Sequence, residues 1–92
     1  MTTTTTNEFN KKNIKEIFEY IIDEIDEGEY VEIYFGRVHI EGEFFEFDEE
    51  DGIIKIATEK YGIVEIDLNK IDEIILEFVH YKNNIRNIFK FY

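Results

Sequence analysis

The chain has 92 residues and a formal net charge of −12, with 22 acidic residues against 10 lysines and arginines. A chain of this length forms one domain with a modest core, for which self-association into a homo-oligomer is a common source of extra stability. Cysteine is absent, which excludes disulfides, thiolate metal sites and thiol nucleophiles. The excess of acid repels phosphate backbones, so it disfavours RNA as a partner and favours a basic protein.

The chain carries no signal for a membrane. No apolar run approaches the ~20 residues of a transmembrane helix, and the N-terminus lacks the apolar stretch of a signal peptide. We therefore expect a cytoplasmic, intracellular protein without membrane contact. The many isoleucines, glutamates and lysines, with no cysteine or glutamine, are compatible with a thermophilic source.

Residues 1–9 include a run of threonines, Thr2–Thr6. Low-complexity polar segments at a chain end are usually solvated and unstructured. We therefore predict a disordered tail over residues 1–9 and a single domain over residues 10–92.

The segment Asn10–Glu27 has the pattern of an amphipathic helix, with apolar residues at i, i+3, i+4 and i+7. These residues are Ile14, Ile17, Phe18, Ile21, Ile22 and Ile25. Gly28 follows where a left-handed residue commonly ends a helix. The sequence therefore predicts an N-terminal helix.

After the helix the apolar pattern changes to a period of two, which is typical of half-buried strands. Gly42 falls inside a long strand and predicts a bend there. The expected strands are Tyr30–Phe35, Val38–Phe47, Ile53–Thr58 and Ile63–Leu68, with turns at Gly36–Arg37, Asp48–Gly52 and Lys60–Gly62. Ile71–Phe78 fits a fifth strand or one helical turn. His80–Tyr92 fits either a short helix or a strand, and we favour the helix.

One helix followed by four or five short strands describes an α+β fold. The bend at Gly42 lets one strand serve both halves of a small sheet. We therefore expect a strongly bent antiparallel β-barrel, Sm-like or SH3-like, with a short C-terminal element.

Several fixed spacings resemble those of a known family. Val31, Ile33 and Phe35 precede a Gly-Arg turn, and Gly42–Asp48 has the pattern Gly-x-Phe-x-x-Phe-Asp. Over about residues 10–78 the chain resembles the Sm-like (LSm/Hfq) family of RNA-binding proteins. The resemblance implies a small β-barrel and a tendency to form rings.

The positions that this family uses to hold RNA differ here. Asp51 and Gly52 stand where the family has a Met-Asn pair, and Asp67 stands where it has the arginine of Ile-Arg-Gly. A carboxylate in place of a cation reverses the sign of the interaction with phosphate. The resemblance therefore implies the fold of the family but not its RNA binding.

The acidic hairpin turn is the candidate contact for a partner. We expect a non-enzymatic, self-associating interaction module that presents this turn, together with a later aspartate, to a basic protein. The candidate residues are Asp48, Glu49, Glu50, Asp51 and Asp67. A Ca²⁺ or Mg²⁺ site is the alternative use of such a turn, but the alternating ligands of an EF-hand are absent. We therefore expect no metal and no other cofactor.

A sharper form of this hypothesis is nucleic-acid mimicry. Glu41, Glu43 and Glu46 recur along one expected strand, so their carboxylates could imitate a row of phosphates. Small viral inhibitors use such rows to occupy the phosphate-binding surface of a target.

Basic residues gather at the other end of the chain. Lys82, Arg86 and Lys90 recur at every fourth position, with no acidic residue among them, and would form one stripe on a helix. Such a stripe would bind a phosphate backbone or dock on the acidic body of a neighbouring subunit. The alternative function is therefore a divergent Sm-like RNA-binding protein that uses its basic termini.

Catalytic groups are scarce. Serine and cysteine are absent, and Thr58 is the one threonine outside the N-terminal run. His39 and His80 are the general bases available near neutral pH, and His39 alternates with apolar residues and so is expected to face solvent. We expect no enzyme and assign no catalytic residues.

Overall fold

The computed structural model describes residues 3–10, 14–70 and 76–92. These residues form one α-helix, seven strands and a 3-10 turn. In chain order they are β1 (Thr3–Phe9), α1 (Ile14–Glu24), β2 (Tyr30–Phe35), β3 (Val38–Asp48), β4 (Ile53–Thr58), β5 (Gly62–Asp67), η2 (Leu68–Lys70), β6 (Leu76–Lys82) and β7 (Ile85–Phe91). Among them, no helix has the length and apolar content needed to cross a membrane.

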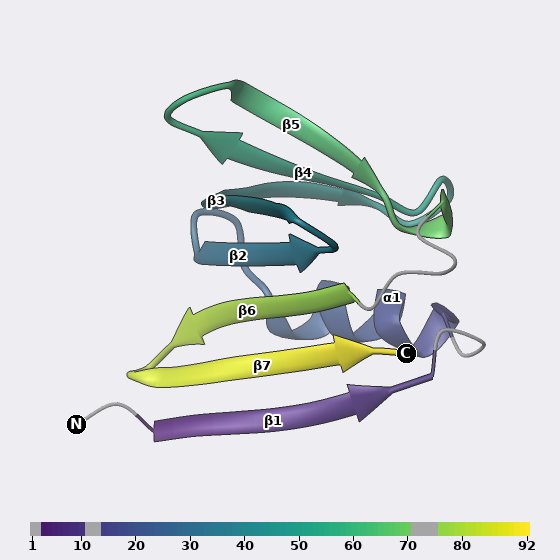
Figure 1. Ribbon diagram of the computed structural model, residues 1–92, viewed down its shortest axis with the longest axis vertical. Helices are drawn as coiled ribbons and strands as arrows, with labels where there is room; N and C mark the ends of the chain where they lie inside the picture. The colour runs from purple at the N-terminus through teal and green to yellow at the C-terminus, as the bar shows by residue number, and fades with distance from the viewer. Residues whose placement is uncertain (1–2, 11–13, 71–75) are drawn as a thin grey trace.

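The seven strands form one sheet in the order β1-β7-β6-β2-β3-β4-β5. β1 runs parallel to β7, and every other neighbouring pair is antiparallel. α1 lies across one face of the sheet, behind β6 and β7 in the view of Figure 1. We call the face toward α1 the inner face and the opposite face the outer face.

The core lies between α1 and the inner face. The apolar stripe of the helix buries Ile17, Phe18 and Ile21, and Ile25 continues it beyond the last turn. These side chains pack against inner-face residues such as Val31. Burial of each large apolar side chain stabilises the fold by about 1.5–3 kcal/mol, so the helix is held by its stripe.

The expected barrel is wrong, because the sheet stays open. β6 pairs with the edge of β2 that a barrel would need for closure, and β7 and then β1 extend the sheet beyond it. The two outermost strands, β1 and β5, are therefore at opposite ends of the sheet (Figure 1). The spacing of the strands along the chain is barrel-like, but it does not specify which edges pair.

The C-terminal segment is a strand rather than the favoured helix. Asn83 and Asn84 both have positive φ, at 52° and 64°. Two such residues form the type I′ turn that matches the twist of a hairpin, and they join β6 to β7. Ile71–Ile75, the first part of the expected fifth strand or helical turn, lies outside the described residues.

The threonine-rich start of the chain also differs from the expectation of a disordered tail. Thr3–Phe9 forms β1, paired in register with β7 from Thr3↔Ile85 to Phe9↔Phe91. The ring of Phe9 lies 5.5 Å from that of Phe91, which ties the end of β1 to the core. β-Branched threonine favours such an extended pairing once an edge is available.

The sequence predicts the helix, the first strands, the turns and the bend close to where they lie, and residues 11–13 of the expected helix are outside the described residues. At the bend, a Cβ on Gly42 would collide with the backbone carbonyl oxygen of Ala57. The register between β3 and β4 then shifts between Phe44 and Glu46, which marks a bulge. The bend and bulge turn β4 and β5 away from the plane of β2 and position the site described next.

Candidate functional site

The outer face is built from tyrosines and glutamates. Alternation along β2 sends Val31 and Ile33 into the core and leaves Tyr30, Glu32 and Tyr34 on the outer face. The register of the neighbouring strands places further residues beside them: His39, Glu41 and Glu43 of β3, Glu77, Val79 and Tyr81 of β6, and Arg86, Ile88 and Lys90 of β7.

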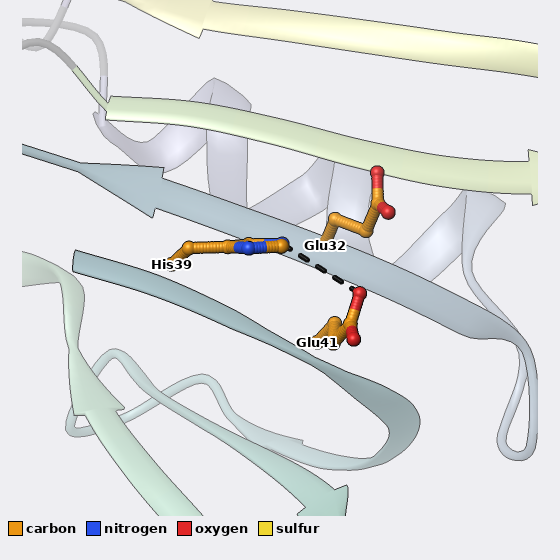
Figure 2. Close-up of side chains that lie close together, drawn as sticks. All are labelled: Glu32, His39 and Glu41. Atoms are coloured by element: carbon orange, nitrogen blue, oxygen red, sulfur yellow. Dashed lines mark ion pairs between the residues drawn. The ribbon is translucent and has the colours of Figure 1, made fainter. Parts of the chain in front are cut away.

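Three of these side chains converge. Glu32 and Glu41 are direct partners across β2 and β3, and His39 is two residues from Glu41 on the same face. One ligand atom from each residue lies within 4.8 Å of the other two. Figure 2 shows the imidazole of His39 directed toward Glu41, with its Nε2 3.7 Å from the Oε2 atom of Glu41.

Tyrosine hydroxyls surround the carboxylates of this group. The Tyr30 hydroxyl donates to Oε2 of Glu41 at 2.6 Å. The hydroxyls of Tyr34 and Tyr81 lie 3.4 and 3.3 Å from Oε2 of Glu32. The hydrogen bond to Glu41, together with burial, raises the pKa of Tyr30 well above its usual range, so this hydroxyl stays protonated and remains a donor.

The ring of His39 is held by stacking. It lies parallel to the ring of Tyr34, at 4.3 Å between centroids and 5° between planes. The two residues are partners in the β2–β3 register. The stack fixes the plane of the imidazole, while the ring edge stays accessible because the His39 side chain is exposed, as the sequence predicts.

A groove opens beside this cluster. β2 pairs with β3 from Val38 onward, but β4 joins β3 only at Glu43. In the described part of the chain, the segment Val38–Gly42 therefore has a strand on one side only. A cavity of about 630 Å³ lies along this part of β3 and the β4–β5 turn, and its polar and aromatic lining includes Tyr30, His39, Glu41, Glu43, Glu59, Lys60 and Tyr61.

The acidic residues predicted from the sequence meet at one corner of the sheet. The Leu68 amide donates to the Gly52 carbonyl at 2.9 Å and the Asn69 side-chain amide donates to the Asp51 carbonyl at 3.0 Å, which fasten the end of β5 to the β3–β4 turn. We call this group the acidic corner: Asp48, Glu49, Glu50, Asp51 and Asp67. No lysine or arginine among the described residues forms an ion pair with any of the five.

Two of these aspartates have local structural roles. Asp48 Oδ1 accepts hydrogen bonds from the amides of Glu50 and Asp51, and Asp67 Oδ1 accepts one from the amide of Asn69. Carboxylates that close turns in this way are common. The role of the corner in binding stays a prediction.

The predicted basic stripe does not form. Lys82 lies on β6 and reaches inward to Asp26 at 3.1 Å and Glu29 at 3.5 Å. Arg86 and Lys90 lie on the outer face of β7, where the Arg86 Nε donates to the Tyr81 hydroxyl at 3.3 Å. A spacing of four gives one stripe on a helix, but on the β6–β7 hairpin it places Lys82 on the inner face and Arg86 and Lys90 on the outer face.

The expected row of carboxylates is also interrupted. Glu41 and Glu43 lie on the outer face of β3, but the bulge follows them. Glu46 then pairs with Lys55 at 2.8 Å, which neutralises its charge locally. Nucleic-acid mimicry stays a prediction, and β3 does not present a continuous row of free carboxylates for it.

A buried polar network that the sequence pattern did not indicate lies on the inner face. His80 is 1% exposed, with the Tyr20 hydroxyl 3.2 Å from Nε2 and Glu29 Oε2 3.4 Å from Nδ1. Burial lowers the pKa of His80, against the opposing effect of Glu29, and raises the pKa of Tyr20 to about 12. Because the imidazole of His80 is shielded from solvent, we interpret the network as structural.

The cluster of Glu32, His39 and Glu41 could have been predicted from the sequence. A two-residue turn at Gly36–Arg37 fixes the register of the hairpin, so Phe35 faces Val38 and each earlier residue faces one further on. That register alone places Glu32 opposite Glu41 and Tyr34 opposite His39. The groove, in contrast, depends on the bend of β3, whose size the apolar pattern of a strand does not specify.

Comparisons with other proteins identify relatives. A family model described as an uncharacterized protein conserved in archaea (DUF2097) matches residues 8–90. The uncharacterized protein MJ0540 of Methanocaldococcus jannaschii is 48% identical over 81 residues, which cover 88% of this chain and 92% of that protein. No solved structure matches this chain.

These findings correct the resemblance to the Sm-like family. The match to the archaeal family spans almost the whole described chain, and the sheet is open rather than closed into a barrel. The shared glycine and aromatic spacings reflect a bent antiparallel hairpin, which different folds can contain. The chain belongs to the DUF2097 family of proteins conserved in archaea.

Proposed function

We propose that this protein is a non-enzymatic binding module that holds a basic, extended segment of a partner protein in the groove beside β3. The observation that carries the proposal is the free edge of Val38–Gly42 next to an acidic groove. An intracellular location and self-association, both expected from the sequence, belong to the same proposal.

The free edge of Val38–Gly42 would bind the backbone of a peptide whatever the sequence of that peptide. An unpaired strand edge offers backbone amides and carbonyls to a second strand, and an extended peptide that pairs there extends the sheet. The bend at Gly42 carries β4 away from this part of β3, so the edge has room for one further strand. The volume of the groove, about 630 Å³, lies within the range of about 300–1,000 Å³ that is usual for ligand sites.

The charges of the groove favour a cationic segment. Glu41, Glu43 and Glu59 line it, opposed by Lys60 alone among the lining residues. Alternate residues of an added strand point to the same side, so arginines or lysines at every second position would meet these carboxylates. The net charge of −12 acts in the same direction at longer range and disfavours RNA.

Aromatic rings in the lining of the groove suit arginine in particular. Tyr30 and Tyr61 both line it, and Tyr61 is strongly exposed. A guanidinium group stacks on aromatic faces and also forms paired hydrogen bonds to carboxylates. We therefore propose arginine-containing segments over lysine-containing ones.

The test is a binding titration with a short fluorescein-labelled peptide of alternating arginine and valine, followed by fluorescence anisotropy at low salt. We expect saturable binding that weakens with salt, and none to a peptide with glutamate in place of arginine. Reversal of two groove charges, Glu43→Lys with Glu59→Lys, is expected to weaken binding at least about tenfold.

A matched variant, Glu49→Lys with Glu50→Lys, makes the same change in net charge at the acidic corner and should bind within about twofold of the natural protein. Equal losses in both variants would mean that net charge alone attracts the peptide. If only the corner variant loses peptide affinity, the partner binds at the acidic corner and not in the groove. Labelled single-stranded RNA in the same assay tests the alternative function, and tighter binding of RNA than of the peptide would overturn the proposal.

A further inference from the structure

We infer that Glu32, His39 and Glu41 form a binding site for one divalent transition-metal ion, of which Zn²⁺ is the representative probe. This site goes beyond the proposed function, because it does not require a bound peptide. Its three ligands come from two neighbouring strands of the sheet (Figure 2), which hold their backbones in fixed register.

The donor set indicates the class of metal. One imidazole nitrogen with two carboxylate oxygens is a mixed set that Zn²⁺, Mn²⁺ and Fe²⁺ accept, whereas Ca²⁺ and Mg²⁺ prefer oxygen alone. Three protein ligands also leave at least one coordination position for water or another donor. His39 and Glu41 line the groove, so that position would face it.

The distances are compatible with a shared ion. A tetrahedral Zn²⁺ about 2.1 Å from each donor would set the donors about 3.4 Å apart. The Nε2 of His39 is already 3.7 Å from Oε2 of Glu41, and all three donors lie within 4.8 Å of one another. The closure needed is therefore about an ångström or less per side chain, which rotation of these long side chains supplies.

The electrostatics of the sheet favour a cation at this point. Like charges directly opposite each other on paired strands destabilise the pairing, and Glu32 faces Glu41. In the part of the chain that the structure describes, no lysine or arginine forms an ion pair with either carboxylate. The guanidinium of Arg86 contacts the Tyr81 hydroxyl and attracts Glu32 only from beyond ion-pair distance. A bound divalent cation would turn this repulsion into attraction.

The surroundings orient the ligands. The hydroxyl of Tyr30 holds Glu41, those of Tyr34 and Tyr81 approach Glu32, and the ring of Tyr34 stacks on His39. Outer partners of this kind fix the direction of metal ligands, and their loss commonly lowers metal affinity by about 10–100-fold. The cluster is therefore supported by side chains that are not themselves ligands.

The experiment is an isothermal titration of ZnCl₂ into the full-length protein after treatment with EDTA, at neutral pH. We expect one ion per chain, retained in 0.5 M NaCl and not displaced by excess Mg²⁺. Binding should raise the melting temperature and weaken in acid, because the imidazole must be neutral to bind a metal. A Co²⁺ absorption spectrum then reports the coordination number of the bound ion.

Three variants decide the assignment. Glu32→Gln and His39→Gln are each expected to weaken Zn²⁺ binding at least about 100-fold. Glu49→Gln removes the same charge as Glu32→Gln but lies at the acidic corner, so it should leave binding unchanged. Circular dichroism of each variant confirms that it is folded.

The inference is overturned if no ion binds in 0.5 M NaCl, or if Glu32→Gln and His39→Gln bind as tightly as the natural protein. It is also overturned if Glu49→Gln weakens binding as much as Glu32→Gln, since that result would describe a general response to negative charge. Peptide binding is measured on the same EDTA-treated protein, so the proposed function is tested without the metal. Loss of metal binding and loss of the proposed function are therefore distinguishable.

Discussion

The inner and outer faces of the sheet differ in what covers them and in the residues that they carry. α1 covers the inner face, whose residues are apolar apart from the buried network around His80. The outer face has no helix over it in the described residues, and its centre is a group of tyrosines and glutamates around Glu32. The inner face holds the fold together, and the outer face carries the residues to which we assign binding.

The outer face also tolerates repulsion that the inner face would not. Two opposed glutamates near water cost less than they would in the core, because solvent screens part of their repulsion, whereas an unpaired buried charge costs several kcal/mol. The acid-rich composition can therefore be concentrated on the outer face, the groove and the acidic corner without loss of the core. The predictions below test this division, from the largest expected effect to the smallest.

The largest effect should come from the inner face. Phe78 in β6 is 2% exposed and belongs to the core, so Phe78→Ala should lower the free energy of unfolding by about 3–5 kcal/mol. Its neighbour Glu77 points to the outer face, and Glu77→Ala should cost about 0.5 kcal/mol or less. Urea denaturation measures both. Losses of equal size would contradict the division between the faces.

The bend that opens the groove should be the next most sensitive point. In Gly42→Ala the new methyl group would meet the backbone carbonyl of Ala57, and backbone cannot move aside as a side chain does. We expect a loss of about 1–3 kcal/mol in urea denaturation. A neutral result would show that β4 is not packed against β3 at this position.

Acid should weaken the inner face through His80. Its pKa is lowered by burial, against the opposing effect of Glu29 and Glu24 and with a lowering effect of Lys82; the Tyr20 hydroxyl also faces the ring. The unfolded chain therefore binds a proton more readily than the folded one. Stability is complete above the ordinary histidine pKa of about 6.5 and falls as the pH drops below it, by at most about 1.4 kcal/mol per pH unit for one proton.

Urea denaturation across this pH range measures that slope. His80→Gln should flatten the slope just below pH 6.5 even if the variant is less stable overall. His39 lies on the outer face and is exposed, so His39→Gln should keep the slope. If His39→Gln removes the slope and His80→Gln does not, the buried network has been assigned the wrong role.

The smallest effect on stability should come from the outer face. Tyr34→Phe keeps the ring that stacks on His39 and removes the hydroxyl 3.4 Å from Glu32. We expect a change within about 0.5 kcal/mol in urea denaturation, accompanied by a weaker response to Zn²⁺. A loss of several kcal/mol would mean that the outer face contributes to the fold as strongly as the core.

The local elements of the fold were predictable, and the pairing of the strands was not. The stripe from Ile14 to Ile25 and the turns at Gly36 and Gly52 carry local signals. The edge of β2, however, is taken by β6, more than 40 residues away in the chain, and no periodicity encodes that partner. The Asn83–Asn84 turn did carry a hairpin signal, which the fourfold spacing of the basic residues obscured.

The site was predictable in part for the same reason. The pairing of Glu32 with Glu41 follows from the two-residue turn between β2 and β3, so it is local information. The groove depends on where β4 leaves β3 and on the packing at Gly42, and both arise from tertiary contacts. Composition predicted an acidic protein but not which of its acidic surfaces is shaped to receive a partner.

The most direct test of the account is an NMR titration of the isotopically labelled protein with the alternating arginine–valine peptide. The account predicts that backbone amide shifts change along Val38–Glu43 and Ala57–Tyr61, while the acidic corner at Asp48–Asp51 stays unchanged. Changes centred on the acidic corner, or small changes spread evenly over all exposed carboxylates, would contradict it.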